Sequence, residues 1–99
     1  MFVLVVRIKA AKGKEKELFE LLKKTINQVH KNEKDTLIYD CHRKIDDPTE
    51  LLMYERYRDK QAWEVTHSSQ PYVKELVASI PDYIEGEINV TAYELVETD

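Results

Sequence analysis

TLIYDCHRKIDDPTELLMYERY, residues 36–57, is the stretch that decides the fold of this 99-residue chain. The side chains of Thr36 to Ile45 form two alternating series that would point to opposite faces of a sheet, as the residues of a strand do. Asp46-Asp47-Pro48 then supplies turn chemistry, and Leu51 to Tyr57 begins a second run typical of a strand. The stretch therefore predicts an antiparallel hairpin.

The segments on either side of this hairpin extend the pattern. Phe2 to Lys9 is apolar on both faces at first, which predicts a strand that is covered on both sides. Apolar residues at helical spacing predict a helix from about Lys14 to His30. Asp59 is a good N-cap for a second helix, which we expect to be broken near Ser68 to Pro71. Ile88 to Val96 predicts the last strand, so the element order is βαββαβ.

This order predicts one domain, residues 1–99, with a ferredoxin-like α+β fold: a four-stranded antiparallel sheet with two helices on one face. The other face of the sheet would then be bare. Yet the strands carry apolar residues at both parities, as Val3 and Val5 do against Leu4 and Val6. A second copy packed sheet to sheet is the simplest cover, so we expect a homodimer through the sheet face.

Composition and charge exclude several kinds of partner. The net charge is −4 with both signs interspersed, so we expect no nucleic-acid partner. RNA-recognition modules share the element order, but Leu51 to Tyr57 lacks their basic, glycine-containing, aromatic signature. No apolar run approaches the ~20 residues that cross a bilayer, so we expect no membrane partner. The single cysteine, Cys41, cannot form an internal disulfide, which is typical of a reducing compartment and predicts a cytoplasmic protein.

Two titratable residues are candidates for catalysis. His67 follows Trp63 by four residues and shares its helical face, so its imidazole could orient a phenolic substrate or accept its proton. Packing with one hydrogen bond is the alternative role of this histidine. Glu55 interrupts an apolar strand, so its carboxyl group must be paired or protonated. It could be a base, an anchor for His67, or the partner in a structural salt bridge.

Other candidates concern ligand binding. Asp40 and His42 project from one face of a strand, but Cys41 points the other way and no third ligand follows, so we expect no metal site. Tyr39 and Tyr72 could line an aromatic pocket, although tyrosines in such positions more often serve packing. The predicted substrate-binding residues are Trp63, Tyr72, Tyr39 and His42.

Three stretches together resemble the antibiotic biosynthesis monooxygenase domain family: residues 39–48, Met53 to Asp59, and Ala62 to His67. The resemblance covers nearly the whole chain, because strand order and length also fit. It implies a dimeric α+β barrel with a pocket between each sheet and its helices. Some members of the family oxygenate phenols or quinols without metal or flavin, while others degrade heme, process autoinducers or have no assigned reaction.

The heme-degrading branch needs an asparagine, a tryptophan and an axial histidine at three positions, which here hold Val6, His67 and Leu76. No iron ligand is left, so the resemblance disfavours heme, and we expect no cofactor. The function expected is a cofactor-independent monooxygenase that acts with O₂ on a small aromatic quinol or phenol. The alternative is a dimeric domain that binds a small ligand or serves a stress response without catalysis.

Overall fold

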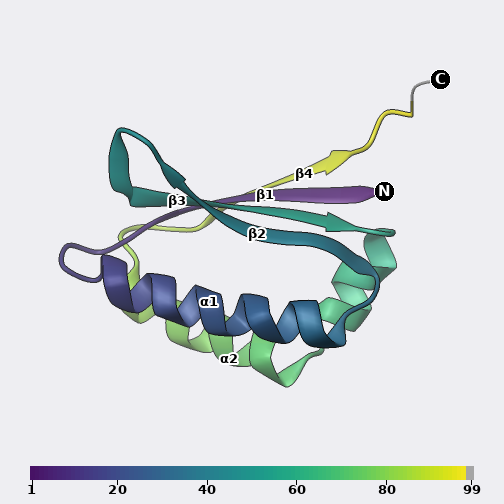
Figure 1. The fold of residues 1–99 in the computed structure, drawn as a ribbon, viewed down its shortest axis with the longest axis horizontal. Helices are drawn as coiled ribbons and strands as arrows, with labels where there is room; N and C mark the ends of the chain where they lie inside the picture. Colours follow the sequence, from purple (N-terminus) through teal and green to yellow (C-terminus); the bar gives the residue numbers. More distant parts are fainter. Residues whose placement is uncertain (98–99) are drawn as a thin grey trace.

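The computed structural model describes residues 1–97 and confirms the predicted hairpin. Strand β2 (Thr36–Lys44) pairs antiparallel with β3 (Asp47–Tyr57), and the end of this hairpin curls away from the rest of the sheet (Figure 1). The turn lies one residue earlier than the sequence predicted, because Lys44 pairs with Asp47. A register shift after Arg43 leaves Pro48 unpaired with β2, so its missing N–H interrupts no ladder bond.

Two more strands complete the predicted sheet. Strand β1 (Phe2–Lys9) pairs antiparallel with β3 on one side and with β4 (Asn89–Glu94) on the other, which gives the order β2-β3-β1-β4. Strand β4 is shorter than the predicted Ile88 to Val96, because its last residue pairs with the first residue of β1. The ferredoxin-like fold is therefore confirmed.

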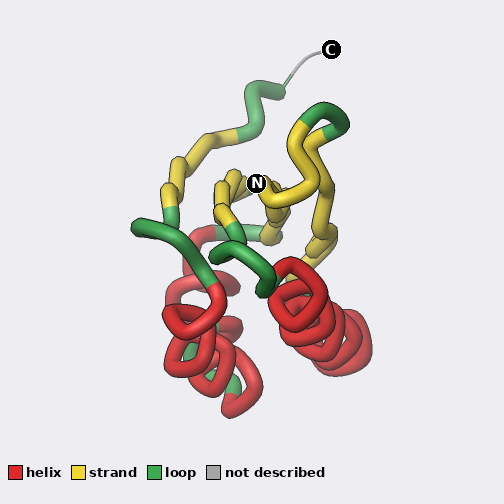
Figure 2. The backbone as a smooth tube through the Cα atoms, turned by 90° about the vertical axis from the view of Figure 1, so that its left-hand side faces the viewer, coloured by secondary structure: helices red, strands yellow, loops and turns green. Residues whose placement is uncertain are grey.

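The helices lie together on one face of the sheet, as Figures 1 and 2 show. Helix α1 (Glu15–Asn32) runs two residues further than predicted, and the N–H of Glu33 still donates to the carbonyl of Val29. The second helical region is broken where the sequence predicted, since three residues separate the end of η1 (Ala62–His67) from the start of α2 (Pro71–Ser79). A short turn, η2 (Ile80–Tyr83), leads on toward β4.

The core forms between the helices and the inner face of the sheet. Strand alternation turns Leu4, Val6 and Ile8 toward the helices, and α1 contributes Leu18 and Leu22 to the same cluster. In the register of β1 and β3, Glu55 lies opposite Leu4 and thus on this inner face. The fold therefore carries a carboxyl group into the middle of its apolar layer.

The structure also bears on membrane association. No helix within residues 1–97 is both long enough and apolar enough to cross a bilayer.

Leu18 provides a test of this packing because its side chain is fully buried. We expect Leu18→Ala to lower the free energy of unfolding by about 2–5 kcal/mol, through lost burial and the cavity left behind. Leu37→Ala, at a position 46% exposed, is the matched control and should change it by less than about 1 kcal/mol. Urea unfolding followed by circular dichroism measures both, and equal losses would contradict the packing described.

Candidate functional site

A cavity of about 270 Å³ lies between the inner face of the sheet and the helices. Its wall is mostly apolar and includes two exposed valines at the helix and strand edges, Val77 and Val90. Its polar lining residues are Tyr39, Glu55, His67 and Ser68. An apolar cavity with a few convergent polar groups is the usual form of a small-molecule site.

Behind this wall, the buried carboxylate of Glu33 joins three parts of the fold. His67 Nδ1 lies 2.8 Å from Glu33 Oε1, and the Thr36 hydroxyl donates to the same oxygen at 2.7 Å. The Tyr72 hydroxyl donates to Oε2 at 2.5 Å. One carboxylate at the end of α1 thus holds η1, the start of β2 and α2 in place.

The electrostatics of this cluster keep Glu33 ionised. Burial alone would raise the pKa of Glu33, but the hydrogen bonds from His67, Tyr72 and Thr36 outweigh it and hold that pKa below its ordinary value. Burial and the bond to Glu33 raise the pKa of Tyr72, which therefore stays a donor.

The ionised carboxylate decides which nitrogen of His67 carries the proton. Because a carboxylate can only accept, Nδ1 must be the donor, and Nε2 of the neutral ring keeps its lone pair. Nε2 makes no hydrogen bond to residues 1–97. Nε2 is also accessible to solvent or ligand. In that range, Arg56 Nε is the one side-chain polar atom that is both fully buried and without a hydrogen-bond partner. His67 lines the cavity, and Nε2 is the ring nitrogen left to accept a hydrogen bond from a ligand there.

Aromatic rings fix the plane of the imidazole. The ring centroids of Tyr39 and Tyr57 lie 5.2 and 5.4 Å from that of His67. Trp63, one turn earlier, stacks on Phe2 at 5.2 Å. The helical turn from Trp63 to His67 is of the wide π type, in which the Ser68 N–H donates to the Trp63 carbonyl. Such turns are frequent at functional sites.

Glu55 is buried, yet its partner is not the one considered from the sequence. The Tyr57 hydroxyl donates to Glu55 Oε1 at 2.5 Å, whereas His67 bonds to Glu33 instead. No salt bridge to Glu55 occurs among residues 1–97. Burial raises the pKa of Glu55, and the bond from Tyr57 offsets only part of that effect.

The structure brings some of the predicted binding residues together and separates others. Tyr39 and Trp63 line the cavity beside His67 and Glu55. Tyr72 does not line it, because its hydroxyl turns to Glu33. His42 pairs with Leu52 on the opposite face of the sheet and is exposed, so it lies away from the cavity.

Sequence reasoning missed Glu33. It lies in the charged run after α1, where nothing distinguishes it from neighbours such as Lys34 and Asp35. Only the fold, which brings the end of α1 beside η1, shows its role.

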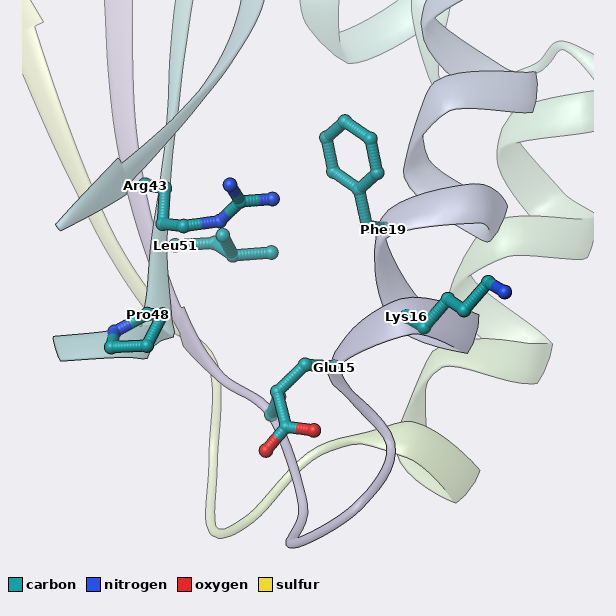
Figure 3. Close-up of a pocket in the computed structure, with 7 residues that line it drawn as sticks. Glu15, Lys16, Phe19, Arg43, Pro48 and Leu51 are labelled. Atoms are coloured by element: carbon teal, nitrogen blue, oxygen red, sulfur yellow. The ribbon is translucent and has the colours of Figure 1, made fainter.

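A second cavity, of about 320 Å³, lies between α1 and the β2–β3 hairpin (Figure 3). Its wall includes Glu15, Lys16 and Arg43, and the Arg43 guanidinium lies 5.4 Å from the centre of the Phe19 ring. The wall of the second cavity thus includes a lysine and an arginine, which the described lining of the first cavity lacks. Within residues 1–97, no three His, Cys, Asp or Glu side chains gather in a way that could hold a metal ion.

Comparison with known proteins shows that the sequence of the chain matches the model of one protein family. Residues 1–79 match the family model described as "Antibiotic biosynthesis monooxygenase". No match came from the curated proteins.

Several solved structures share the fold. A Deinococcus radiodurans protein, proposed to be an antibiotic biosynthesis monooxygenase, is 21% identical with a TM-score of 0.88, over 100% of this chain and 96% of its own. A Nitrosomonas europaea protein proposed to be the same is 18% identical with a TM-score of 0.91, over 98% and 100%. A Caulobacter crescentus protein proposed likewise is 21% identical with a TM-score of 0.91, over 97% and 90%. At these identities the likeness shows the fold alone.

The Glu33 cluster makes a prediction about stability and pH. Glu33→Gln keeps the shape but removes the charge, so we expect a loss of about 1–3 kcal/mol in the free energy of unfolding at neutral pH. Because the pKa of Glu33 is depressed in the folded state, this contribution is complete above the unfolded pKa and disappears as pH falls through the folded pKa.

Urea unfolding of both proteins between neutral and acid pH measures the difference. Glu20→Gln, at an exposed position of α1, serves as the control and should show no loss. A difference between wild type and Glu33→Gln that stays constant down to strongly acid pH would contradict the assignment of charge to Glu33.

Proposed function

The chain belongs to the antibiotic biosynthesis monooxygenase family, and on that premise we propose that it is a cofactor-independent monooxygenase of small aromatic quinols or phenols. One observation carries the proposal. His67 lines an apolar cavity, is held through Nδ1 by the Glu33 carboxylate, and keeps Nε2 without a hydrogen-bond partner in residues 1–97. A base fixed by a second group at the wall of a cavity is an arrangement suited to proton abstraction.

The first step is proton transfer. A phenolic hydroxyl in the cavity donates to Nε2 of His67, and its proton passes to that nitrogen as the ring becomes cationic. Glu33, 2.8 Å from Nδ1, stabilises the resulting positive charge. Glu33 is thus a positioning residue, because it acts on the substrate only through His67.

The second step is the reaction with O₂, for which the ionised ring supplies all the electrons. One electron passes from the quinolate to O₂, and the two radicals combine to form a C–O bond at a ring carbon that bears hydrogen. The O–O bond then breaks: one oxygen stays on the ring, and the other leaves as water with the ring hydrogen and a proton. A quinol and O₂ thus give a hydroxyquinone and water, with atoms and electrons balanced.

The apolar wall serves the same chemistry. Leu4, Met53 and Trp63 present no ionisable groups to the ring, so this part of the wall keeps water away from the radical pair. The wall also favours a flat aromatic ligand, which gains from burial of apolar surface.

A binding domain without catalysis is the second candidate, and one observation favours it. The bonds of Glu33 to His67, Tyr72 and Thr36 would also be explained by their structural role alone. Binding of a quinol without consumption of O₂ would support this reading.

We also propose that the free face of the sheet forms a homodimer. No helix covers this face in residues 1–97, and it presents half-buried apolar residues such as Val5, Leu52 and Tyr54. The buried and unpartnered Nε of Arg56 belongs to the same face. An interface of standard size, ~800 Å² per partner, would fit on a four-stranded sheet.

His67→Asn tests the proposed base. The asparagine amide can still donate to Glu33, but no nitrogen can take a proton from the substrate. We expect turnover to fall on the order of 10²-fold or more, with little loss of folded protein. Oxygen uptake with a panel of quinols, and mass analysis of the product formed from isotopically labelled O₂, measure it.

His30→Asn, a change at an exposed histidine of α1, is the control and should keep wild-type turnover. Unchanged turnover in His67→Asn would show that this histidine only packs. Absence of turnover with every quinol in the wild type would favour the binding domain.

The dimer has its own test. Leu52→Asp places a charge on the free sheet face, so the association should weaken, because an unpaired buried charge is costly. Light scattering at micromolar concentration should give twice the chain mass for the wild type and a lower mass for the variant. A wild-type monomer under these conditions would refute the dimer.

A further inference from the structure

Among the described residues, the wall of the cavity beneath the sheet has a carboxyl group but no lysine or arginine side chain. Glu55 lines it, and none of its lining residues within 1–97 is a lysine or an arginine. The basic residues Lys16 and Arg43 belong instead to the second cavity, between α1 and the β2–β3 hairpin, whose wall also includes Glu15 (Figure 3). The two cavities therefore differ in the charge of ligand they would favour.

Glu55 faces its cavity without a counterion. Its Oε1 accepts a hydrogen bond from the Tyr57 hydroxyl. Its Oε2 makes no hydrogen bond to residues 1–97 and is not among the fully buried atoms, as is also true of Nε2 of His67. The one group nearby that can become cationic, His67, already has Glu33 as its partner at 2.8 Å. Among the described residues that line this cavity, no positive charge is thus left for a ligand.

This arrangement affects charged and neutral ligands differently. An anionic ligand would lose its hydration in an apolar cavity. It would also either place a second negative charge beside the Glu55 carboxylate or require that carboxyl group, whose pKa burial already raises, to hold a proton. A neutral hydroxyl can instead donate to Nε2 of His67 or to Oε2 of Glu55. Nε2 of His67 and Oε2 of Glu55 are therefore both matched by the hydroxyl groups of an uncharged compound.

We propose that Glu55 makes this cavity selective for neutral hydroxy-aromatic ligands over those that carry a carboxylate or another anionic group. The inference deepens the proposed function, since it relies on that function for the aromatic class of ligand. Glu55 is then a specificity-determining residue, a role separate from that of His67 as base.

Two ligands of the same shape test the selectivity. Gentisamide and gentisate are dihydroxybenzene rings that differ only in a neutral amide against a carboxylate. Trp63 is the only tryptophan of the chain and lines the cavity, so quenching of its fluorescence under nitrogen measures binding without turnover. At neutral pH we expect gentisate to bind at least about tenfold more weakly than gentisamide. Equal or tighter binding of gentisate would overturn the proposal.

Two matched variants locate the cause. Glu55→Gln can still accept the hydrogen bond from Tyr57, so it should fold, and its preference for gentisamide should shrink by about tenfold. Arg43→Gln, in the second cavity, should leave the preference unchanged. An unchanged preference in Glu55→Gln, or its loss in Arg43→Gln, would contradict the assignment to Glu55.

The binding test is independent of catalysis. Selective binding of gentisamide without any consumption of O₂ would reject the monooxygenase but keep this inference. Turnover of gentisate and gentisamide at equal rates and affinities would keep the monooxygenase but reject the role of Glu55. Failure of both ligands to quench Trp63 would reject the inference.

Discussion

The Glu33 carboxylate is the group on which the arrangement of the site depends. Placed at the end of α1, it accepts hydrogen bonds from His67, Tyr72 and Thr36, which belong to three other elements. A buried carboxylate is costly unless its hydrogen bonds are satisfied, so each of these donors helps to keep it in place. In return, its charge fixes the proton of His67 on Nδ1 and leaves Nε2 for the cavity. A single ion thus links the stability of the fold to the orientation of the proposed base.

The two buried carboxyl groups have opposite environments. Hydrogen bonds outweigh burial at Glu33 and lower its pKa, whereas burial dominates at Glu55 and raises its pKa. Titratable groups whose surroundings push their pKa values apart are typical of sites with divided roles. In the proposed function, Glu33 positions His67 from behind the wall, and Glu55 faces the ligand. This division agrees with a cavity that prefers a ligand with a neutral hydroxyl group over one that arrives as an anion.

Most of the fold could be predicted from the sequence, because local patterns determine it. Alternation and turn chemistry gave the hairpin, the apolar period gave α1, and Pro71 marked the break in the second helix. The site could be predicted only in part. His67 and Glu55 stood out as polar residues in apolar segments, but the partner of His67 did not, since Glu33 looks like any charge of a surface loop and acquires its role through contacts far apart in sequence. The cytoplasmic location stays a prediction from the single Cys41.

The most direct test of the account is the protonation state of the His67 ring in the resting protein. Nitrogen NMR of isotope-labelled protein, at a pH where the ring is neutral, distinguishes the two tautomers through the shifts of Nδ1 and Nε2. The account predicts a proton on Nδ1, bonded to Glu33, and an unprotonated Nε2. A ring with its proton on Nε2 would contradict the account, because His67 would then have no nitrogen free to accept a proton in the cavity.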